Sequence, residues 1–171
     1  VARSPLHAQS LGISTVYQEV NLCPNLSVAE NILLGREPRR AGRIHWSALY
    51  RRAQDILTWL DVDVDVRQNV ESYPGAIQQV GVISRALEIS AKVLILDEAT
   101  SSLAAHETAK LFQVMRKLKD EGIGIIFITH FLDQVYAIAD RITVLRNGRL
   151  VGTFEAATLA RDELGREAEL A

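Results

Sequence analysis

Two short, uninterrupted apolar runs, VLIL at residues 93–96 and IIFI at residues 125–128, constrain the fold of this chain more than any other feature. Because neither run alternates with polar residues, each is typical of a strand buried on both faces of a parallel sheet. An amphipathic segment at residues 106–120 separates them and predicts a crossover helix. This succession predicts an α/β fold with a mainly parallel sheet.

The N-terminal half predicts a third strand followed by helices. Residues 11–17 are short and β-rich, and we expect a strand that ends near Gln18. Ser27 and Glu30 have the spacing of a capping box, which predicts a short helix from Ser27 to about Gly35. Apolar residues at helical spacing predict two longer helices, one starting near Ser47 and one at residues 78–90.

Two segments rich in arginine predict exposed structure. Residues 36–43 form a basic loop, which we interpret as solvated rather than as a phosphate-binding patch. Near the C-terminus, Asn147-Gly148 lies between two β-rich runs, which is the strongest short signal for a hairpin. A short helix is expected before it, at residues 132–139.

Composition excludes several classes of protein. Nineteen Lys and Arg against 21 Asp and Glu give the 171 residues a net charge of -2, which excludes bulk electrostatic binding to nucleic acid or to an anionic membrane. A hydrophobic content of 48% is that of a folded globular chain, and no apolar stretch approaches the roughly 20 residues that span a bilayer. The single cysteine, Cys23, excludes an internal disulfide or a multi-cysteine zinc site, so a cytosolic compartment is expected.

An acidic pair follows the first apolar run. Asp97 and Glu98 lie at the expected carboxyl end of a buried parallel strand, where open α/β sheets place their ligands. There Asp97 can hold Mg²⁺ and Glu98 can polarise an attacking water. The alternative is that both acids cap the next helix, where the helix dipole also favours negative charge.

Other polar residues follow neighbouring elements. His130 follows the second apolar run after a single residue, Thr129, and Gln18 ends the third predicted strand and can contact the metal or its water. Residues 73–79 run from a turn into a helix start, which is a ready site for an anion. Taken singly, the glutamine and the helix start are weak signals.

Together, the order and spacing of these motifs resemble the nucleotide-binding subunit of ATP-binding-cassette (ABC) transporters. In that resemblance Gln18 is the Q-loop glutamine, residues 73–79 the signature motif and residues 93–98 the Walker B strand with its catalytic glutamate. Residues 101–104 then form the D-loop and His130 is the switch histidine. The resemblance extends over roughly residues 13–165.

Within the family, the chain resembles the sugar-import ATPases, in particular the galactofuranose-type importers. Residues 16–31, 76–79 and 130–136 carry this likeness. It implies an ATPase that couples ATP hydrolysis to carbohydrate transport, with ATP and Mg²⁺ bound. It also implies roles for single residues: Glu98 and His130 as catalytic, Gln18 and Asp97 as ligands of Mg²⁺ and the nucleotide, and Gly75, Ala76 and Gln78 as nucleotide-binding.

The resemblance also implies an architecture and partners. It predicts a partial P-loop NTPase (RecA-like) core at residues 1–24 and 91–157, and an ABC-type helical subdomain at residues 25–90. Residues 158–171 are expected to form a C-terminal helix or tail. Expected partners are transmembrane permease subunits, a second ATP-binding cassette and, indirectly, a periplasmic sugar-binding protein, but no nucleic acid. The expected location is the cytoplasmic face of the inner membrane, as a peripheral protein.

The sequence departs from the family pattern at several positions. No Gly-x-x-x-x-Gly-Lys-Ser/Thr phosphate-binding loop occurs in the 171 residues, so we expect a cassette truncated ahead of the Q-loop and inactive alone. Pro74 stands at the signature serine, Ala104 at the D-loop aspartate and Ala99 at the proline after the catalytic glutamate.

These departures leave an alternative, a catalytically dead cassette remnant that only binds the permease or a partner cassette. A DNA-repair or chromosome-structure ATPase is disfavoured, because only 60 positions without sustained heptads separate Gln18 from Gln78.

Overall fold

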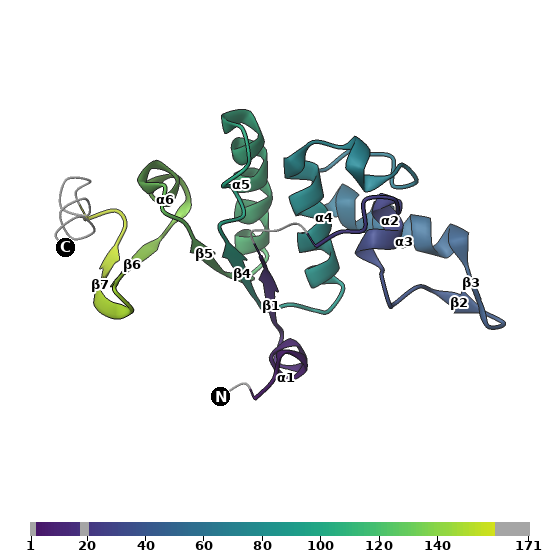
Figure 1. Ribbon diagram of the computed structural model, residues 1–171, viewed down its shortest axis with the longest axis horizontal. Coiled ribbons are helices and arrows are strands. Elements are labelled where there is room, and N and C mark those ends of the chain that lie inside the picture. Colours follow the sequence, from purple (N-terminus) through teal and green to yellow (C-terminus); the bar gives the residue numbers. More distant parts are fainter. Residues whose placement is uncertain (1–2, 18–20, 160–171) are drawn as a thin grey trace. The chain divides into compact units, whose positions relative to one another are not determined.

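A computed structural model of the chain describes residues 3–17 and 21–159 (Figure 1). It divides into two packing units, Val1–Ile128 and Thr129–Ala171, and each is described by itself. The first unit contains the sheet and most of the helices. The predicted subdomain boundaries at residues 24, 90 and 157 stay predictions.

The first unit is built on a three-stranded parallel sheet. Its strands are β1 (Ile13–Val16), β4 (Val93–Asp97) and β5 (Gly124–Ile128), in the order β1-β4-β5. Ile13 lies opposite Val93, and Val93 lies opposite Gly124. Both predicted apolar strands and the N-terminal strand therefore form, and the α/β fold class with a parallel sheet is confirmed.

On one face of this sheet, α5 (Ala105–Asp120), the helix that connects β4 to β5, packs against β5. Leu94 and Leu96 of β4 are fully buried, and Phe112 of α5 contacts Phe127 of β5 edge to face, with ring centroids 5.9 Å apart. Burial of apolar side chains on this face provides the main stabilisation of the strands.

The opposite face of β5 does not have the burial predicted for it. Ile126 and Ile128 are 52% and 46% exposed. Because successive side chains of a strand point to opposite faces, these residues lie away from Phe127 and from α5. The middle strand β4 is also buried on one face only, because Val93 and Ile95 are partly exposed, so the prediction of double burial is wrong for both apolar strands.

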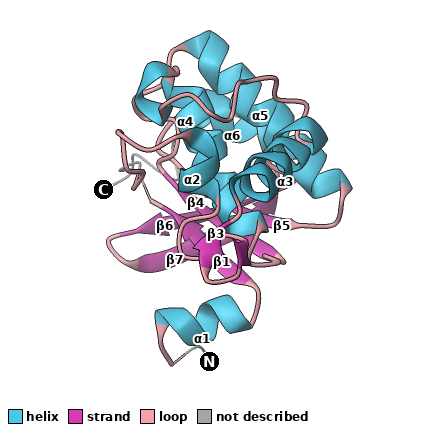
Figure 2. Ribbon diagram, turned by 90° about the vertical axis from the view of Figure 1, so that its right-hand side faces the viewer, coloured by secondary structure: helices cyan, strands magenta, loops and turns pink. Residues whose placement is uncertain are grey.

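The remaining helices of this unit are α1 (Pro5–Ser10), α2 (Val28–Ile32), α3 (Trp46–Trp59), the 3₁₀ turn η1 (Val70–Ser72) and α4 (Gly75–Leu87). α2 packs against both α3 and α4, and Figure 2 shows the three helices grouped together. The capping box at the start of α2 is confirmed, because Ser27 Oγ accepts from the Glu30 N–H and Glu30 Oε2 accepts from the Ser27 N–H.

Both longer helices predicted for the N-terminal half form, and one of them starts earlier than predicted. In α3 the buried residues Leu49, Ala53 and Leu57 follow the predicted spacing. α4 starts at Gly75, three residues earlier than the amphipathic pattern predicts, because the Pro74 carbonyl already accepts from the Ile77 and Gln78 N–H groups.

The basic loop at residues 36–43 is not irregular. It forms a small antiparallel hairpin of β2 (Arg39–Arg40) and β3 (Arg43–Ile44). Its tip residues Ala41 and Gly42 both have positive φ, 50° and 79°, which suits a tight two-residue hairpin turn. The residues of both strands are exposed.

In its described part, up to residue 159, the second unit contains α6 (Leu132–Ile138) and the hairpin of β6 (Arg141–Arg146) and β7 (Arg149–Glu155). The predicted C-terminal helix or tail at residues 158–171 lies almost entirely outside the described residues. The predicted turn is confirmed, with positive φ at Asn147 (50°) and Gly148 (73°). A small core of Ile142, Val144 and Leu159 closes the unit. None of the described helices in either unit has the length and apolar character needed to cross a membrane.

Candidate functional site

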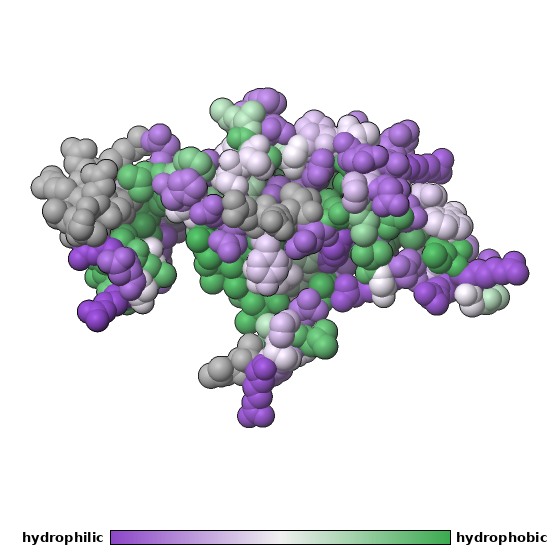
Figure 3. Space-filling model, in the orientation of Figure 1, coloured by the Kyte–Doolittle hydropathy of each residue, from purple (hydrophilic) through white to green (hydrophobic). Residues whose placement is uncertain are grey.

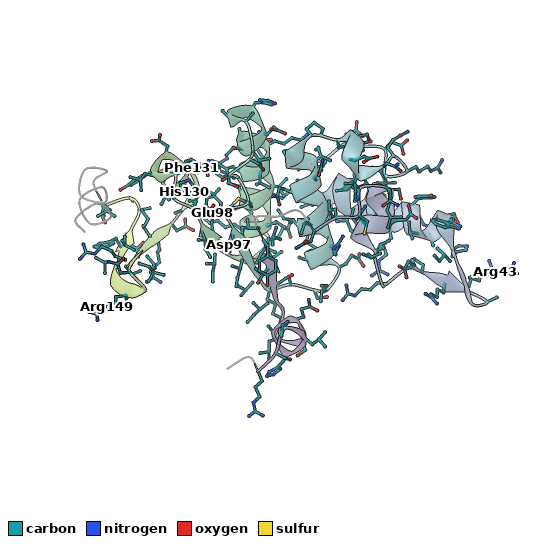
Figure 4. All side chains as sticks on the ribbon, in the orientation of Figure 1. Arg43, Asp97, Glu98, His130, Phe131 and Arg149 are labelled. Atoms are coloured by element: carbon teal, nitrogen blue, oxygen red, sulfur yellow. The ribbon has the colours of Figure 1, made fainter. Side chains whose placement is uncertain are left out.

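Asp97 and Glu98 lie at the carboxyl end of β4, in the middle of the three-stranded sheet (Figure 4). Asp97 is the last residue of the strand, in register with Ile128 of β5, and is partly exposed. Directly before Asp97, the side chain of Leu96 is fully buried and anchors the end of β4. The structure therefore places this acidic pair at the sheet edge where ligands of parallel sheets bind.

Glu98 has a left-handed backbone conformation, with φ of +48°. For a residue with a side chain, such a conformation costs about 1–3 kcal/mol and persists only where surrounding contacts hold it. Here the Glu98 N–H donates to the Ile128 carbonyl at 2.9 Å, and the Glu98 carbonyl accepts from the Ser101 N–H at 3.0 Å. Strain held on both sides of the residue is typical of a functional position.

The alternative that these acids cap the following helix is wrong. α5 begins at Ala105 and its N-cap is Ala104, six residues beyond Glu98. The carboxylates therefore stand before a separate turn, in which Ala99 and Thr100 are buried and the Leu103 N–H donates to the Thr100 carbonyl.

This turn brings the predicted D-loop to the predicted signature segment. A Cβ on Gly75 would lie only 2.8 Å from Cδ2 of Leu103, so the end of the Leu103 side chain would have to move. A glycine at position 75 thus permits the close approach of the α4 N-terminus to residues 101–104.

Glu107 joins the same two segments and was not among the predicted site residues. Its Oε2 accepts from the Ala104 N–H at 3.0 Å, and its Oε1 accepts from the Ala76 N–H at 3.3 Å. These two hydrogen bonds hold the pKa of the Glu107 carboxyl below its usual value, and the bond from Ala104 has the larger effect. The available sequence signal is a glutamate three residues after an N-cap, but Ala104 lacks the side-chain oxygen that makes a capping box recognisable.

The predicted nucleotide-binding residues of α4 have partners within the chain. Ala76 donates its N–H to Glu107, and Gln78 Nε2 donates to the Tyr73 carbonyl at 2.9 Å. Pro74 occupies the N-cap with φ of -56°, and it offers no N–H and no side-chain acceptor. The N-terminus of α4 therefore holds a carboxylate, as its dipole favours.

A buried network holds the segment that follows Gln18. Asn31 of α2 is 0% exposed; its Oδ1 accepts from the Cys23 N–H at 2.8 Å, and its Nδ2 donates to the carbonyls of Cys23 and Leu26. Arg85 of α4 donates to the carbonyls of Asn31 and Asn21, at 2.8 and 3.0 Å. Sequence reasoning did not single out either side chain.

Two predicted site residues are not placed with the others. Gln18 lies outside the described residues. His130 belongs to the second unit, where its ring lies 4.1 Å from that of Phe131 between centroids. A joint role of His130 with Glu98 therefore stays a prediction.

Comparison with known protein families shows the family to which this chain belongs. The sequence model of the ABC transporter family matches residues 2–101, more than half of the chain. This chain belongs to the ABC transporter family.

Relatives of this ABC chain are named as sugar transport proteins. It is 51% identical over 162 residues to the galactofuranose transporter ATP-binding protein YtfR of Escherichia coli K12, which covers 95% of the chain and 32% of that protein. It is 49% identical over 160 residues to the fructose import ATP-binding protein FruK of Bifidobacterium longum, covering 93% of the chain and 31% of that protein. The chain thus spans about a third of the length of these relatives.

Solved structures agree on the fold. The cassette cbiO1 from Clostridium perfringens aligns with a TM-score of 0.75 at 22% identity, over 98% of this chain and 67% of that one. A nucleotide-free ATP-binding cassette of an ABC transporter aligns with the same score and identity, over 96% and 67% of the two chains. The described architecture is that of an ABC ATPase cassette.

Proposed function

We propose that this chain contributes the Walker B, signature and D-loop segments of the ATP-binding subunit of a sugar importer, which couples ATP hydrolysis to carbohydrate transport. The observation that carries the proposal is the acidic pair Asp97 and Glu98 at the sheet edge, with the strained backbone of Glu98 fixed by Ile128. About half of the aligned residues are identical to those of sugar transport ATP-binding proteins, which supports a sugar as the transported substrate.

The position of Asp97 fits a magnesium ligand. Mg²⁺ in ATPase sites is held by one or two carboxylates together with water and substrate phosphates, rather than by a cage of protein ligands. Asp97 is a partly exposed carboxylate at the sheet edge, and the described residues contain no group of three His, Cys, Asp or Glu that could hold a metal. Asp97 and Gln18 would hold the ion, which when bound neutralises charge on the phosphates.

Glu98 is the residue that acts on water in this proposal. A carboxylate accepts a proton from, or orients, the water that attacks the γ-phosphate. Its fixed backbone sets the direction of the Cα–Cβ bond before substrate arrives, which lowers the cost of organising the site. His130 is proposed to contact the γ-phosphate from the beginning of the second unit.

The N-terminus of α4 is proposed to face nucleotide bound by a second cassette. Gly75, Ala76 and Gln78 are the residues proposed to bind it, and the Ala76 N–H would then exchange the Glu107 carboxylate for phosphate. That this N-terminus already holds a carboxylate supports a preference for an anion. Permease subunits and, through them, a periplasmic sugar-binding protein are the other proposed partners. The subunit would then lie at the cytoplasmic face of the membrane as a peripheral protein.

The 171 residues contain no phosphate-binding loop motif, so we propose that they bind ATP weakly and turn over little by themselves. Titration of Mg-ATP against the purified chain tests this point. Micromolar affinity would contradict it.

The decisive experiment supplies a phosphate-binding loop segment from a family member ahead of residue 1 and measures phosphate release and nucleotide binding. Glu98→Gln is expected to reduce hydrolysis by two orders of magnitude or more, as removal of a general base does, while nucleotide binding persists. Glu71→Gln, which removes an exposed carboxylate on η1, is the matched control. Unchanged turnover in Glu98→Gln would refute the catalytic role.

Pro74 and Ala104 favour a second candidate, a cassette that binds the permease or a partner cassette without turnover. Both lack the side-chain oxygen found at the corresponding family positions. The same experiment separates the two candidates, because this second one predicts no hydrolysis above background even when the loop segment is present and ATP is bound.

A further inference from the structure

The hairpin β2–β3 and its flanks carry a concentrated positive charge that the proposed ATPase site does not use. Residues 36–46 contain four exposed arginines, Arg36, Arg39, Arg40 and Arg43, against Glu37 as the single acid. The whole chain has a net charge of -2. We call these eleven residues the basic hairpin.

Charges within the basic hairpin are not balanced. Arg40 lies directly opposite Arg43 in the two-stranded register, and like charges in such positions destabilise a hairpin. Glu37 lies 3.9 Å from Arg39, at the outer limit of an ion pair, and its Oε1 accepts from the Gly35 N–H at 2.9 Å. That backbone hydrogen bond, more than Arg39, lowers the pKa of Glu37. The arrangement is therefore more stable against an anionic partner than alone.

Aromatic and aliphatic side chains accompany the arginines. Ile44 and Trp46 are 36% and 46% exposed, directly after the hairpin turn. The Trp46 ring stacks on Tyr50, with centroids 5.9 Å apart, and the Arg67 guanidinium lies 5.2 Å from the centroid of the Tyr50 ring. Figure 3 shows hydrophilic atoms beside hydrophobic ones at the place of β2 and β3, and Figure 4 labels Arg43 at this hairpin.

The sequence alone favours a solvated loop here, but the ordered hairpin places the arginines and Trp46 in one short segment. We propose that the basic hairpin is a local contact surface for anionic phospholipid headgroups. Guanidinium groups bind phosphate in a bidentate manner, and clusters of four or more basic residues are attracted to anionic membranes. Tryptophan beside such a cluster favours a lipid partner over an acidic protein, because its amphipathic ring is stable at the level of the headgroups. The exposed tip of Ala41 and Gly42 carries no side chain that would select a particular protein surface. This contact requires neither nucleotide nor permease, so it is independent of the proposed ATPase function.

Vesicle co-sedimentation of the 171-residue chain tests the proposal. The chain is expected to sediment with vesicles of 30% phosphatidylglycerol in phosphatidylcholine, and not with pure phosphatidylcholine vesicles, with binding that falls as salt rises. The triple variant Arg39→Gln, Arg40→Gln, Arg43→Gln is expected to bind about 100-fold more weakly, since each arginine near an anionic surface contributes about fivefold. The control Arg3→Gln, Lys110→Gln, Arg149→Gln removes the same charge from exposed positions elsewhere, and circular dichroism verifies the fold of both variants.

An equal loss of vesicle binding in both triple variants would refute the assignment, because binding would then depend only on the net charge of the chain. Binding to polyglutamate but not to vesicles would also refute it, and would favour an acidic protein partner. A second measurement uses Trp59→Phe, which leaves Trp46 as the single tryptophan. Its emission is expected to shift to shorter wavelength on addition of the anionic vesicles, and an unchanged spectrum would overturn the proposed position of the hairpin.

Discussion

The Glu107 carboxylate on α5 accepts a hydrogen bond from the Ala76 N–H, the second residue of α4, although 31 positions separate the two residues in sequence. The same carboxylate accepts from the Ala104 N–H at the start of α5. One side chain therefore satisfies donors at two helix N-termini and holds the signature segment against the D-loop.

The first prediction concerns the pH dependence that this contact creates. The pKa of Glu107 lies below its usual 4.5, so its hydrogen bonds stabilise the fold above that pH and lose their effect as the pH falls through the lowered value. Glu107→Gln is expected to lower the melting temperature at pH 7, with the difference from wild type shrinking towards pH 3. Melting curves of both proteins from pH 3 to pH 8 measure this, with Glu71→Gln as the control. A difference that stays constant with pH would contradict the prediction.

The second prediction concerns the N-cap of α5. Ala104 has the extended backbone of an N-cap, with φ of -68° and ψ of 160°, but no oxygen to accept a hydrogen bond from the first turn. Ala104→Ser is expected to raise the free energy of unfolding by about 0.5–2 kcal/mol. Urea denaturation measures the change. Ala109→Ser, an exposed position inside the same helix, is the control and is expected to lower stability slightly, since serine is a poorer helix former than alanine.

The third prediction concerns the buried amide of Asn31. Its replacement by alanine leaves the Cys23 N–H without its acceptor and removes donors to the Cys23 and Leu26 carbonyls. Asn31→Ala is expected to lower the free energy of unfolding by about 1–3 kcal/mol, the cost of a buried group left unsatisfied. Asn69→Ala, at an exposed asparagine, is expected to change it by less than about 0.5 kcal/mol. Equal effects of the two variants in urea denaturation would show that the network does not hold this segment.

The fourth prediction concerns the signature segment in a complete pair of cassettes. Pro74→Ser adds a hydroxyl at the N-terminus of α4, and a charge-assisted hydrogen bond from it to phosphate would contribute about 1.5–3 kcal/mol. We expect a modest rise in phosphate release, because proline also stiffens this helix start, and a larger rise when Ala104→Asp is added. Steady-state rates of wild type, both single variants and the double variant measure the effect. Four equal rates would show that these departures are neutral.

Local sequence signals were sufficient for much of the fold. The Ser27–Glu30 capping box, the Asn147-Gly148 turn and the alternation of apolar runs with amphipathic helices were all predicted, and all are confirmed. Each depends on residues within a few positions of one another, whose preferences act in any context. The hairpin at residues 39–44 was missed, because Ala41 does not carry the usual residue signature of a turn with two positive φ values.

What the sequence by itself determined is the family, the α/β class and the acidic pair at the end of the central strand. Only the tertiary structure decided that Glu98 is strained rather than a helix cap, that Glu107 joins two helix N-termini and that Ile126 and Ile128 are exposed. These properties depend on which distant segments meet. A residue pattern specifies the face on which a side chain lies, but the partners across that face come from elements tens of positions away, and only their packing determines burial and hydrogen bonding.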